Sequence, residues 1–577
     1  MIPISRRALA AGFALAIGAA VPAAQAQRGS TGPDLPRVPG VVAQHGMVVA
    51  QEQRAARIGV EVLKRGGNAV DAAVAVGFAM AVTYPRAGNI GGGGFMLIHL
   101  ANRKEQFAID YRETAPAATT RETYLDAKGE ADQRKSRDLG TAVGVPGTVA
   151  GLALALEKYG SRKFTLAQLI APAITMAREG IPVEDDTADS LPYVRERLAR
   201  WPASAKIFLR RDGQVLQPGD RFVQADLART LEAIARKGPQ AFYEGIIARR
   251  IAAAVQAAGG LMTADDLKNY KPVERTPLRG TYRGYDIVSM PPPSSGGILL
   301  VQMLNVLEGF KLRADDPASL HLIIETMKHA YADRAQFMGD PSFTKVPVTG
   351  LMSKAYAEKI REQINRDKAR PPQEIRPGEP LPFEGANTTH YSVVDRFGNA
   401  VSNTYTINDS YGVGLVAEGT GVLLNNELDD FSAKPDAPNS FGLIGLNEAN
   451  APAPNKRPLS SMTPTIVFKE GKPVLVTGSP GGSRFITVVL QIVVNVIDHR
   501  MSIADAVRAP RVHHQWMPDQ VVIERHMPNS LVKALEARGH NTVLRPLLTS
   551  ANSIMVIGRG IGGGADPRTR GALAAGY

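Results

Sequence analysis

The chain has 577 residues, 44% of them hydrophobic and 21% charged, which is the composition of a globular protein large enough to bury an extensive core. It contains no cysteine, so disulfide bonds, thiolate nucleophiles and cysteine-ligated metals are excluded. The net charge is +12, but lysine and arginine are dispersed among acids and are not interleaved with aromatic residues, so we expect no nucleic-acid-binding surface.

The first 26 residues have the pattern of an export signal. Arg6-Arg7 form a basic start, residues 8–21 are apolar, and Ala24-Gln25-Ala26 is a small-x-small cleavage site. We expect cleavage before Gln27 and a periplasmic or secreted mature chain. The arginine pair partly resembles a twin-arginine signal, so the export route stays open, and an uncleaved segment would act as a membrane anchor. No later stretch approaches the ~18 continuous apolar residues of a membrane span.

Two helices are predicted early in the mature chain, at Gln53–Arg65 and Asn68–Ala81, from the helical spacing of apolar residues and the Gly-Gly stop between them. Four glycines, Gly91–Gly94, then lead into an apolar strand at Phe95–Leu100. No Gly-Lys-Ser/Thr follows them, so we expect a loop where backbone lies close to a ligand or to a neighbouring segment, not a phosphate cradle. A short strand at Phe107–Glu113 comes next.

Helices are predicted to dominate residues 147–258, and a further helix is predicted at Ile298–Leu307. His321, Glu325 and His329 lie four residues apart, which is a spacing that helical metal sites use. Helices often carry this spacing by chance, and we predict no metal site. Residues 367–386 are polar and rich in proline, arginine and glutamate, which is typical of a mobile linker.

A β-hairpin is predicted directly after this linker. Two strand-like runs, Thr389–Asp395 and Ala400–Asn408, flank a three-residue loop whose glycine suits a left-handed conformation. Continuing that register places Thr388 opposite Thr406, and alternation along the strand puts Thr406 and Asn408 on one face. Two threonine hydroxyls and an asparagine amide are therefore expected to converge at the open end of the hairpin.

The rest of the chain is predicted to alternate between loops and regular elements. A loop rich in proline, glycine and asparagine spans residues 434–455, a length that is usually functional or disordered. Strands are predicted at Thr465–Phe468 and Val474–Thr477, and a helix at Phe485–Ile497.

Three segments carry a family resemblance: Asn387–Asn426 with Asp430, Pro458–Met462, and Thr477–Arg484. Together they closely resemble γ-glutamyltranspeptidases, and the similarity covers nearly all of the chain after the signal segment. The family consists of N-terminal nucleophile hydrolases, made as a precursor that cuts itself immediately before a threonine. The matching bond here is Asn387–Thr388.

The resemblance implies a large chain, 27–387, and a small chain, 388–577, that stay together as a heterodimer. It also implies an α/β (α+β) fold, a four-layer αββα sandwich built from both chains.

The resemblance also implies a catalytic group. Thr388 would be the nucleophile, and its free α-amine, which titrates near ~7.7–8.0, would be the general base. Thr406 would orient the Thr388 hydroxyl. Gly481 and Gly482 would turn two backbone N–H groups toward the tetrahedral oxyanion. No metal or organic cofactor is implied.

The substrate-binding positions of the family are matched as well. The α-ammonium of a γ-glutamyl group would bind to Asn408, Glu427 and Asp430, and its α-carboxylate to Arg112, Ser460 and Ser461. A guanidinium suits a carboxylate because its planar fork makes a bidentate contact. Asp430 carries the most weight for substrate choice, because an acid there requires a cationic partner.

Two positions depart from many bacterial members of the family. Phe441 stands where they place a lid tyrosine, so we expect a gating hydrogen bond to be missing. Glu427 replaces the glutamine of some relatives, which could shift the balance between hydrolysis and transfer. Neither change affects the catalytic assignment.

The function implied is attack on the γ-glutamyl amide of glutathione or a related compound, followed by resolution with water or with an acceptor amino acid or peptide. One alternative is an acylase for glutaryl-cephalosporin-type amides, whose acyl group lacks the ammonium; the acid at Asp430 argues against it. Another alternative is a non-catalytic periplasmic ligand-binding or scaffold protein, which would be expected to have lost Thr388 or the glycine pair.

Overall fold

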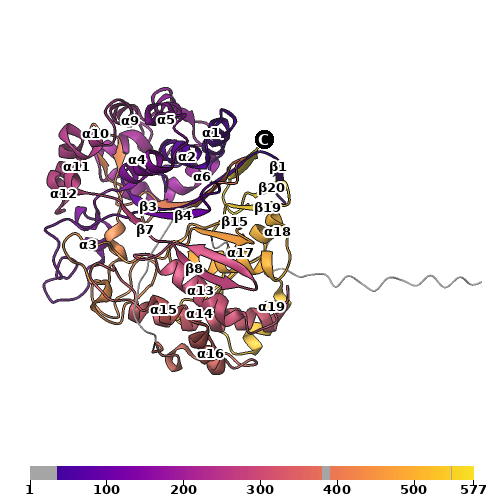
Figure 1. The fold of residues 1–577 in the computed structure, drawn as a ribbon. Helices are drawn as coiled ribbons and strands as arrows, with labels where there is room; N and C mark the ends of the chain where they lie inside the picture. The colour runs from indigo at the N-terminus through magenta and orange to yellow at the C-terminus, as the bar shows by residue number, and fades with distance from the viewer. Residues whose placement is uncertain (1–34, 380–389, 547–548) are drawn as a thin grey trace, which may run out of the picture.

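The computed structural model describes residues 35–379, 390–546 and 549–577. Two seven-stranded sheets lie face to face at the centre, and helices cover the outer face of each sheet (Figure 1). The layers therefore run helix, sheet, sheet, helix, and the predicted four-layer α+β architecture is confirmed. Within the described ranges, no helix is both long enough and apolar enough to cross a membrane.

Sheet A is antiparallel and has the order β21-β2-β10-β11-β3-β4-β7. Strands from both sides of the predicted cleavage site take part in it, with the β10–β11 hairpin inserted between β2 and β3. Its strands are β2 (Met47–Ala50), β3 (Gly93–Leu100), β4 (Glu105–Tyr111), β7 (Val273–Arg275), β10 (His390–Val394), β11 (Ala400–Thr406) and β21 (Leu573–Gly576).

Sheet B is also antiparallel and has the order β1-β20-β19-β15-β14-β9-β8. Its strands are β1 (Val41–Ala43), β8 (Leu278–Tyr282), β9 (Tyr285–Ser289), β14 (Thr465–Lys469), β15 (Lys472–Thr477), β19 (Ser553–Ile557) and β20 (Gly560–Gly564). Three small sheets complete the strands: β5 (Ile181–Pro182) with β6 (Arg221–Phe222), β12 (Val416–Ala417) with β13 (Val422–Leu423), and β16 (Val512–His513), β17 (Val521–Glu524) and β18 (Thr542–Arg545).

The helices before residue 270 include those that cover sheet A: α1 (Gln53–Lys64), α2 (Ala69–Thr83), α4 (Thr148–Tyr159), α5 (Leu166–Glu179), α9 (Ala225–Lys237) and α11 (Gly245–Ala257). Shorter helices of the same region are α3 (Gln133–Arg137), α6 (Asp185–Ser190), α7 (Arg195–Ala199), α8 (Pro202–Phe208), α10 (Gln240–Tyr243) and α12 (Ala264–Asn269). On the side of sheet B lie α13 (Ser295–Leu307), α14 (Pro317–Phe337), α15 (Val348–Leu351), α16 (Lys354–Gln363), α17 (Phe485–Ile497), α18 (Ile503–Arg508) and α19 (Asn529–Ala537) (Figure 1).

The alternation of side chains along β3 divides the core in two. Phe95 and Leu97 belong to the cluster between the sheets, which continues into α13, α14 and α17. Met96 and Ile98 belong to the cluster under α1, α2 and α4. Because successive strand side chains point to opposite faces, a strand buried on both sides is apolar throughout, and this is why β3 could be recognised as an apolar run.

The β10–β11 hairpin has the predicted register. His390 pairs with Thr404 and Val394 with Ala400, and the turn closes through Gly398, whose φ is +83°. The hairpin lies inside sheet A, between β2 and β3. Its open end therefore meets the glycine run that begins β3.

Candidate active site

Thr406 ends β11 against the glycine run. It is buried and pairs with Gly93, and a Cβ on Gly92 would lie 1.9 Å from the Thr406 carbonyl oxygen. Only glycine allows the loop to pass so close, as expected for backbone beside a neighbouring segment. The Thr406 hydroxyl accepts the N–H of Asn408 at 2.8 Å and donates to the Asn408 carbonyl only at 3.5 Å, so it remains able to orient another group. The predicted cleavage site, Asn387–Thr388, lies outside the described residues.

Gly481 and Gly482 form a turn immediately before α17. Their φ angles are +121° and +60°, a region that residues with a side chain rarely adopt. Their N–H groups donate to no acceptor among the described residues, and both glycines border a cavity. Two such N–H groups can stabilise an oxyanion that forms in the cavity.

Phe441 lies over this glycine turn. A Cβ on Gly482 would be 2.3 Å from the phenyl ring, so the ring packs directly on the backbone there. The N–H of Phe441 is held by Asn439 Oδ1 at 3.0 Å, and its carbonyl accepts from Gln515 at 3.1 Å. A phenyl ring has no hydroxyl, so it covers the turn by shape alone.

Arg112 forms the centre of a buried ion cluster. Its Nη2 binds Asp430 Oδ2 at 2.7 Å, its Nη1 binds Glu427 Oε1, and its Nε donates to the Pro458 carbonyl at 3.3 Å. The Glu113 carboxylate is 3.9 Å from Nη1. All four ionisable side chains are almost completely buried. A lone Arg-Glu pair in the sequence is typical of a surface ion pair, whereas here the pair lies in the core.

Three carboxylates, those of Glu113, Glu427 and Asp430, lie around Arg112, and the charges of Arg334 and Arg457 also act on Asp430 and Glu113 respectively. Burial raises the pKa of Asp430 to about 6, and it raises the pKa of Glu113 and of Glu427 above the usual range, although Arg112 opposes each shift. A cation that bound here would favour the ionised carboxylates and so lower these pKa values.

Ser460 and Ser461 belong to the segment that contacts Arg112. They follow Pro458, whose carbonyl contacts Arg112, and both hydroxyls are buried without a hydrogen-bond partner among the described residues. Unpaired buried hydroxyls are rare because each loses its hydrogen bonds to water. An anion bound there would satisfy both.

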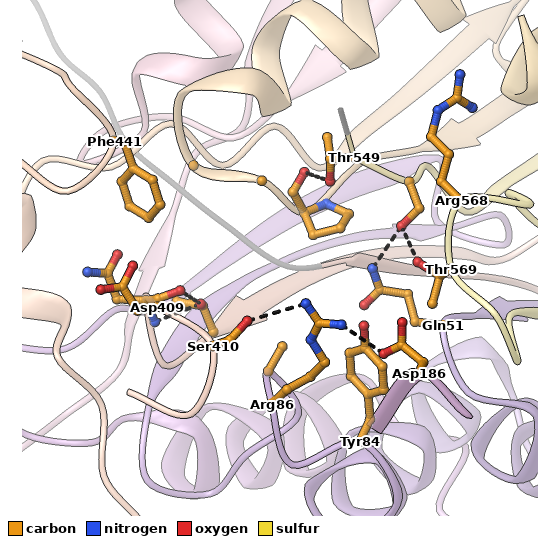
Figure 2. A pocket seen from close by; sticks show the side chains of 17 residues that line it. Gln51, Tyr84, Arg86, Asp186, Asp409, Ser410, Phe441, Thr549, Arg568 and Thr569 are labelled. Atoms are coloured by element: carbon orange, nitrogen blue, oxygen red, sulfur yellow. Dashed lines mark hydrogen bonds and ion pairs between the residues drawn. The ribbon is translucent and has the colours of Figure 1, made fainter. Parts of the chain in front are cut away.

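A cavity of about 350 Å³ lies beside the glycine turn, and Figure 2 shows the side chains that line it. Five of the predicted site residues line it: Thr406, Asn408, Phe441, Gly481 and Gly482. The predicted residues that do not line it are those of the ion cluster and its serines: Arg112, Glu427, Asp430, Ser460 and Ser461. The two groups are connected through Asn439, which donates to Asp430 at 3.0 Å and holds the backbone of Phe441.

Several residues of the site were not predicted from the sequence. Glu113 was predicted only as the end of a short strand, although its position beside Arg112 on that strand was a usable signal. Other residues of the cavity lining had no local signal, because separate elements contribute them: Gln51, Tyr84, Arg86, Asp186, Thr549, Ser550 and Thr569.

His321 and Glu325 lie one turn apart on α14, as their spacing predicts. The third potential ligand beside them is His540 and not His329. His321 contacts His540 at 2.8 Å through Nδ1 and the Asn365 carbonyl at 2.8 Å through Nε2. Glu325 forms an ion pair with Lys328 at 2.7 Å. Hydrogen bonds within the protein thus occupy the potential ligand atoms of His321 and Glu325, and we assign no metal to the cluster.

The chain matches the family model described as Gamma-glutamyltranspeptidase over residues 55–576. It is 52% identical over 542 residues to the glutathione hydrolase proenzyme of Escherichia coli (strain K12), covering 93% of each chain. It is 40% identical to the acylase ACY 1 proenzyme of Pseudomonas sp. (strain V22), covering 87% of this chain and 88% of the relative. The crystal structure of cephalosporin acylase from Bacillus halodurans superposes with a TM-score of 0.84 at 29% identity, covering 94% of this chain and 98% of that one. The protein is therefore an enzyme of the γ-glutamyltranspeptidase family.

Proposed function

We propose that this enzyme is an exported γ-glutamyltranspeptidase that acts on glutathione and related γ-glutamyl amides. The observation that carries the proposal is the buried cluster of Arg112, Glu427 and Asp430, with two unpaired serine hydroxyls on the segment that contacts Arg112. The free end of a γ-glutamyl group is a zwitterion, with an ammonium and a carboxylate on one carbon. The cluster offers groups of complementary charge for both.

Substrate binding would exchange ion pairs within the cluster. The α-carboxylate would take Arg112 with Ser460 and Ser461, and the α-ammonium would take the carboxylates that Arg112 releases. Each buried charge would keep a partner, which avoids the large penalty of an isolated buried ion. Asn408 would add an amide oxygen on the ammonium side.

The nucleophile would be made by cleavage of the chain itself. Breaking the Asn387–Thr388 bond would free the Thr388 α-amine, which can then accept the proton of the Thr388 hydroxyl. The pairing of His390 with Thr404 supports this role for the end of β11, where the Thr406 hydroxyl retains the capacity to orient the nucleophile. His390 is not proposed as the base, because its two ring nitrogens contact the Thr404 and Ser392 hydroxyls at 3.1 and 2.7 Å and burial lowers its pKa to about 3.

Catalysis would proceed in two acyl-transfer steps. The Thr388 Oγ attacks the γ-carbonyl carbon, its proton passes to the α-amine, and the N–H groups of Gly481 and Gly482 stabilise the oxyanion. Collapse breaks the C–N bond, and the leaving amine takes the proton. Water or an acceptor amine then attacks the γ-glutamyl ester and restores the free Thr388 hydroxyl.

Acylase activity on glutaryl-cephalosporin-type amides is the second candidate, because an acylase relative and an acylase structure are similar to this chain. A glutaryl group has a carboxylate but no ammonium, so it would supply no cation to replace Arg112 beside Asp430 and Glu427 once Arg112 turned to the substrate. We therefore expect γ-glutamyl anilides to be cleaved much faster than glutaryl anilides. The reverse order would favour the acylase.

The decisive experiment is a denaturing gel of purified wild type beside Thr388→Ala. Scaling 61.7 kDa by 361 and 190 of 577 residues predicts fragments of roughly 39 and 20 kDa from wild type, and one uncut band from the variant. Terminal sequencing of the small fragment should begin at Thr388. A folded wild type that stays uncut would refute the mechanism.

Export is proposed from the signal pattern of residues 1–26. Fractionation of cells producing the full chain should place the mature protein, beginning at Gln27, in the periplasm or the medium. Retention of the intact segment in the membrane fraction would indicate an anchor instead.

A further inference from the structure

The cavity of Figure 2 has two different ends. Phe441 and Asp409 stand at one end, near the glycine turn and Thr406, and Gln51, Asp186 and Thr569 stand at the other. The buried Arg112 cluster borders neither end. The volume of about 350 Å³ lies within the range of small-ligand sites.

The reaction needs a place for the group on the nitrogen side of the scissile amide, and this inference rests on the proposed function. If the γ-glutamyl end occupies the Arg112 cluster, the nitrogen side extends into the open cavity. In a peptide substrate or acceptor, that side carries a peptide N–H and ends in an α-carboxylate. Gln51, Arg86 and Asp186 line the part of the cavity away from Phe441, and we call this part the far wall (Figure 2). It offers a partner for each of these two groups.

Arg86 supplies a cation between the two ends, because it contacts both Asp186 and Ser410 (Figure 2). Its side chain is 30% exposed, and its Nη1 binds Asp186 Oδ2 at 2.9 Å, which fixes the guanidinium. Its Nη2 contacts Ser410 Oγ only at 3.4 Å, near the limit of a hydrogen bond, so donors remain for a carboxylate. The other arginine of the described lining, Arg568, is committed to Glu524, Asp566 and two backbone carbonyls.

Gln51 supplies an acceptor on the far wall. Its Nε2 donates to Ser550 Oγ at 3.1 Å, and Thr569 donates to the same oxygen at 2.9 Å, which holds the amide in one orientation. Its Oε1 has no partner among the described residues, although the side chain is 98% buried. A buried carbonyl oxygen without a donor is destabilising until a ligand N–H reaches it.

We propose that this wall is the subsite for the leaving group and the acceptor, and that it selects peptides with a free terminal carboxylate. Arg86 binds the carboxylate, and Gln51 Oε1 accepts the peptide N–H. Arg86 and Gln51 thus determine acceptor specificity, while the Arg112 cluster determines the acyl group.

The test compares acceptors with one γ-glutamyl donor. Glycylglycine has both groups, glycylglycine amide lacks the carboxylate, and glycylsarcosine lacks the peptide N–H. Wild type should use glycylglycine with a kcat/KM at least tenfold above either analogue. Equal use of the three by wild type would overturn the proposal without any variant.

Variants then assign each preference to a residue. Arg86→Gln should reduce the preference for glycylglycine over its amide at least tenfold, and Arg86→Lys should restore part of it. Gln51→Leu should reduce the preference over glycylsarcosine. Arg570→Gln is the matched control, because Arg570 pairs with Asp185 and Asp189 on the same helix as Asp186 but does not line the cavity. Two bands on a denaturing gel would show that each variant folds and is processed.

Failure of this inference is distinguishable from failure of the proposed function. A wild type that neither hydrolyses nor transfers any γ-glutamyl group refutes the function, and the subsite with it. A wild type that transfers the group, while Arg86→Gln keeps the wild-type preference, refutes only the assignment of Arg86.

Discussion

Asp430 is the residue whose charge state most directly controls donor binding. Its carboxylate faces a set of charged groups on several elements: Arg112, Arg334, Asp429, Glu427 and Glu113. Burial raises its pKa to about 6, above the usual ~3.9. A bound α-ammonium favours the ionised carboxylate, so binding should lower this pKa and release a proton at acidic pH.

The release of this proton determines how the KM of the donor changes with pH. Below pH 6 the donor must displace it, so the KM of a γ-glutamyl donor should rise as the pH falls, by at most about tenfold per pH unit for this group. Above pH 6 the dependence from Asp430 should vanish. Initial rates from pH 4.5 to 8 give the profile.

Asp430→Asn is the control for this profile, because it keeps the shape and removes the titration. The variant should have a higher donor KM at pH 7 and a flatter acid limb. An unchanged acid limb in Asp430→Asn would mean that Glu427 or Glu113 carries the titration instead.

Residue identity was easier to predict from the sequence than residue environment. Resemblance to the family marked Arg112, Glu427 and Asp430, and the structure places all three in one ion cluster. Their complete burial was not predictable from composition, because acids and arginines are usually exposed. Arg86 had no signal at all, since its partners Asp186 and Ser410 are brought to it only by the fold.

Among the elements, α14 has an additional role beside the predicted cleavage site. Its polar side chains bind the backbone of the segment that leads toward that site: His321 contacts Asn365 O, Lys328 donates to Arg370 O, Glu325 accepts from Arg370 N, and Asp333 accepts from Gly378 N at 2.9 Å. Residues 365–378, which include much of the predicted linker, are thereby tied to the helix. Residues 380–389 lie outside the described part of the chain.

Among the described residues before the cleavage site, the hydrogen bond from the Gly378 N–H to Asp333 is the contact with α14 that lies nearest to that site in sequence. Gly378 precedes Asn387 by nine residues, so this contact limits where the scissile bond can lie to within roughly 30 Å. We predict that Asp333→Ala slows conversion of the precursor by about tenfold, the value of one hydrogen bond to a charged group. A time course of the two fragments on a gel measures this.

Asp333→Asn provides the comparison, because its amide oxygen can still accept from Gly378. It should be processed at nearly the wild-type rate. Burial raises the pKa of Asp333 to about 6, so the folded chain binds this proton more tightly than the unfolded chain, and stability from this group falls as the pH rises toward 6. Equal delay in both variants would contradict the role of this contact.

Elements with a strong local pattern were predicted closely. The helix at Phe485–Ile497 has the predicted ends, and α1 and α2 begin or end within two residues of the prediction. The hairpin register was predictable because turn length and side-chain alternation constrain it. The contacts of residues 365–378 were not predictable, because their partners on α14 and near residue 516 are distant in sequence.

At the scale of the whole molecule, both sheets mix strands from the two sides of the predicted cut. In sheet A, β10 pairs with β2 and β11 with β3, so a hairpin from after the cut lies between strands from before it. In sheet B, β14 pairs with β9, and β1 pairs with β20. Neither segment can form a complete sheet without the other.

Separation of the cut chains would therefore break backbone ladders on both sides of the hairpin and expose both core clusters. The hydrophobic free energy lost would far exceed the entropy gained from two free chains, because the clusters include most of the buried side chains of both segments.

We predict that the cut enzyme remains one particle. Native gel filtration should give a peak in which every fraction contains the two fragments in equal amounts. The uncut Thr388→Ala variant should elute at the same volume, and the fragments should separate only in denaturant. Elution of the small fragment alone under native conditions would show that the segments fold independently, contrary to the strand order of both sheets.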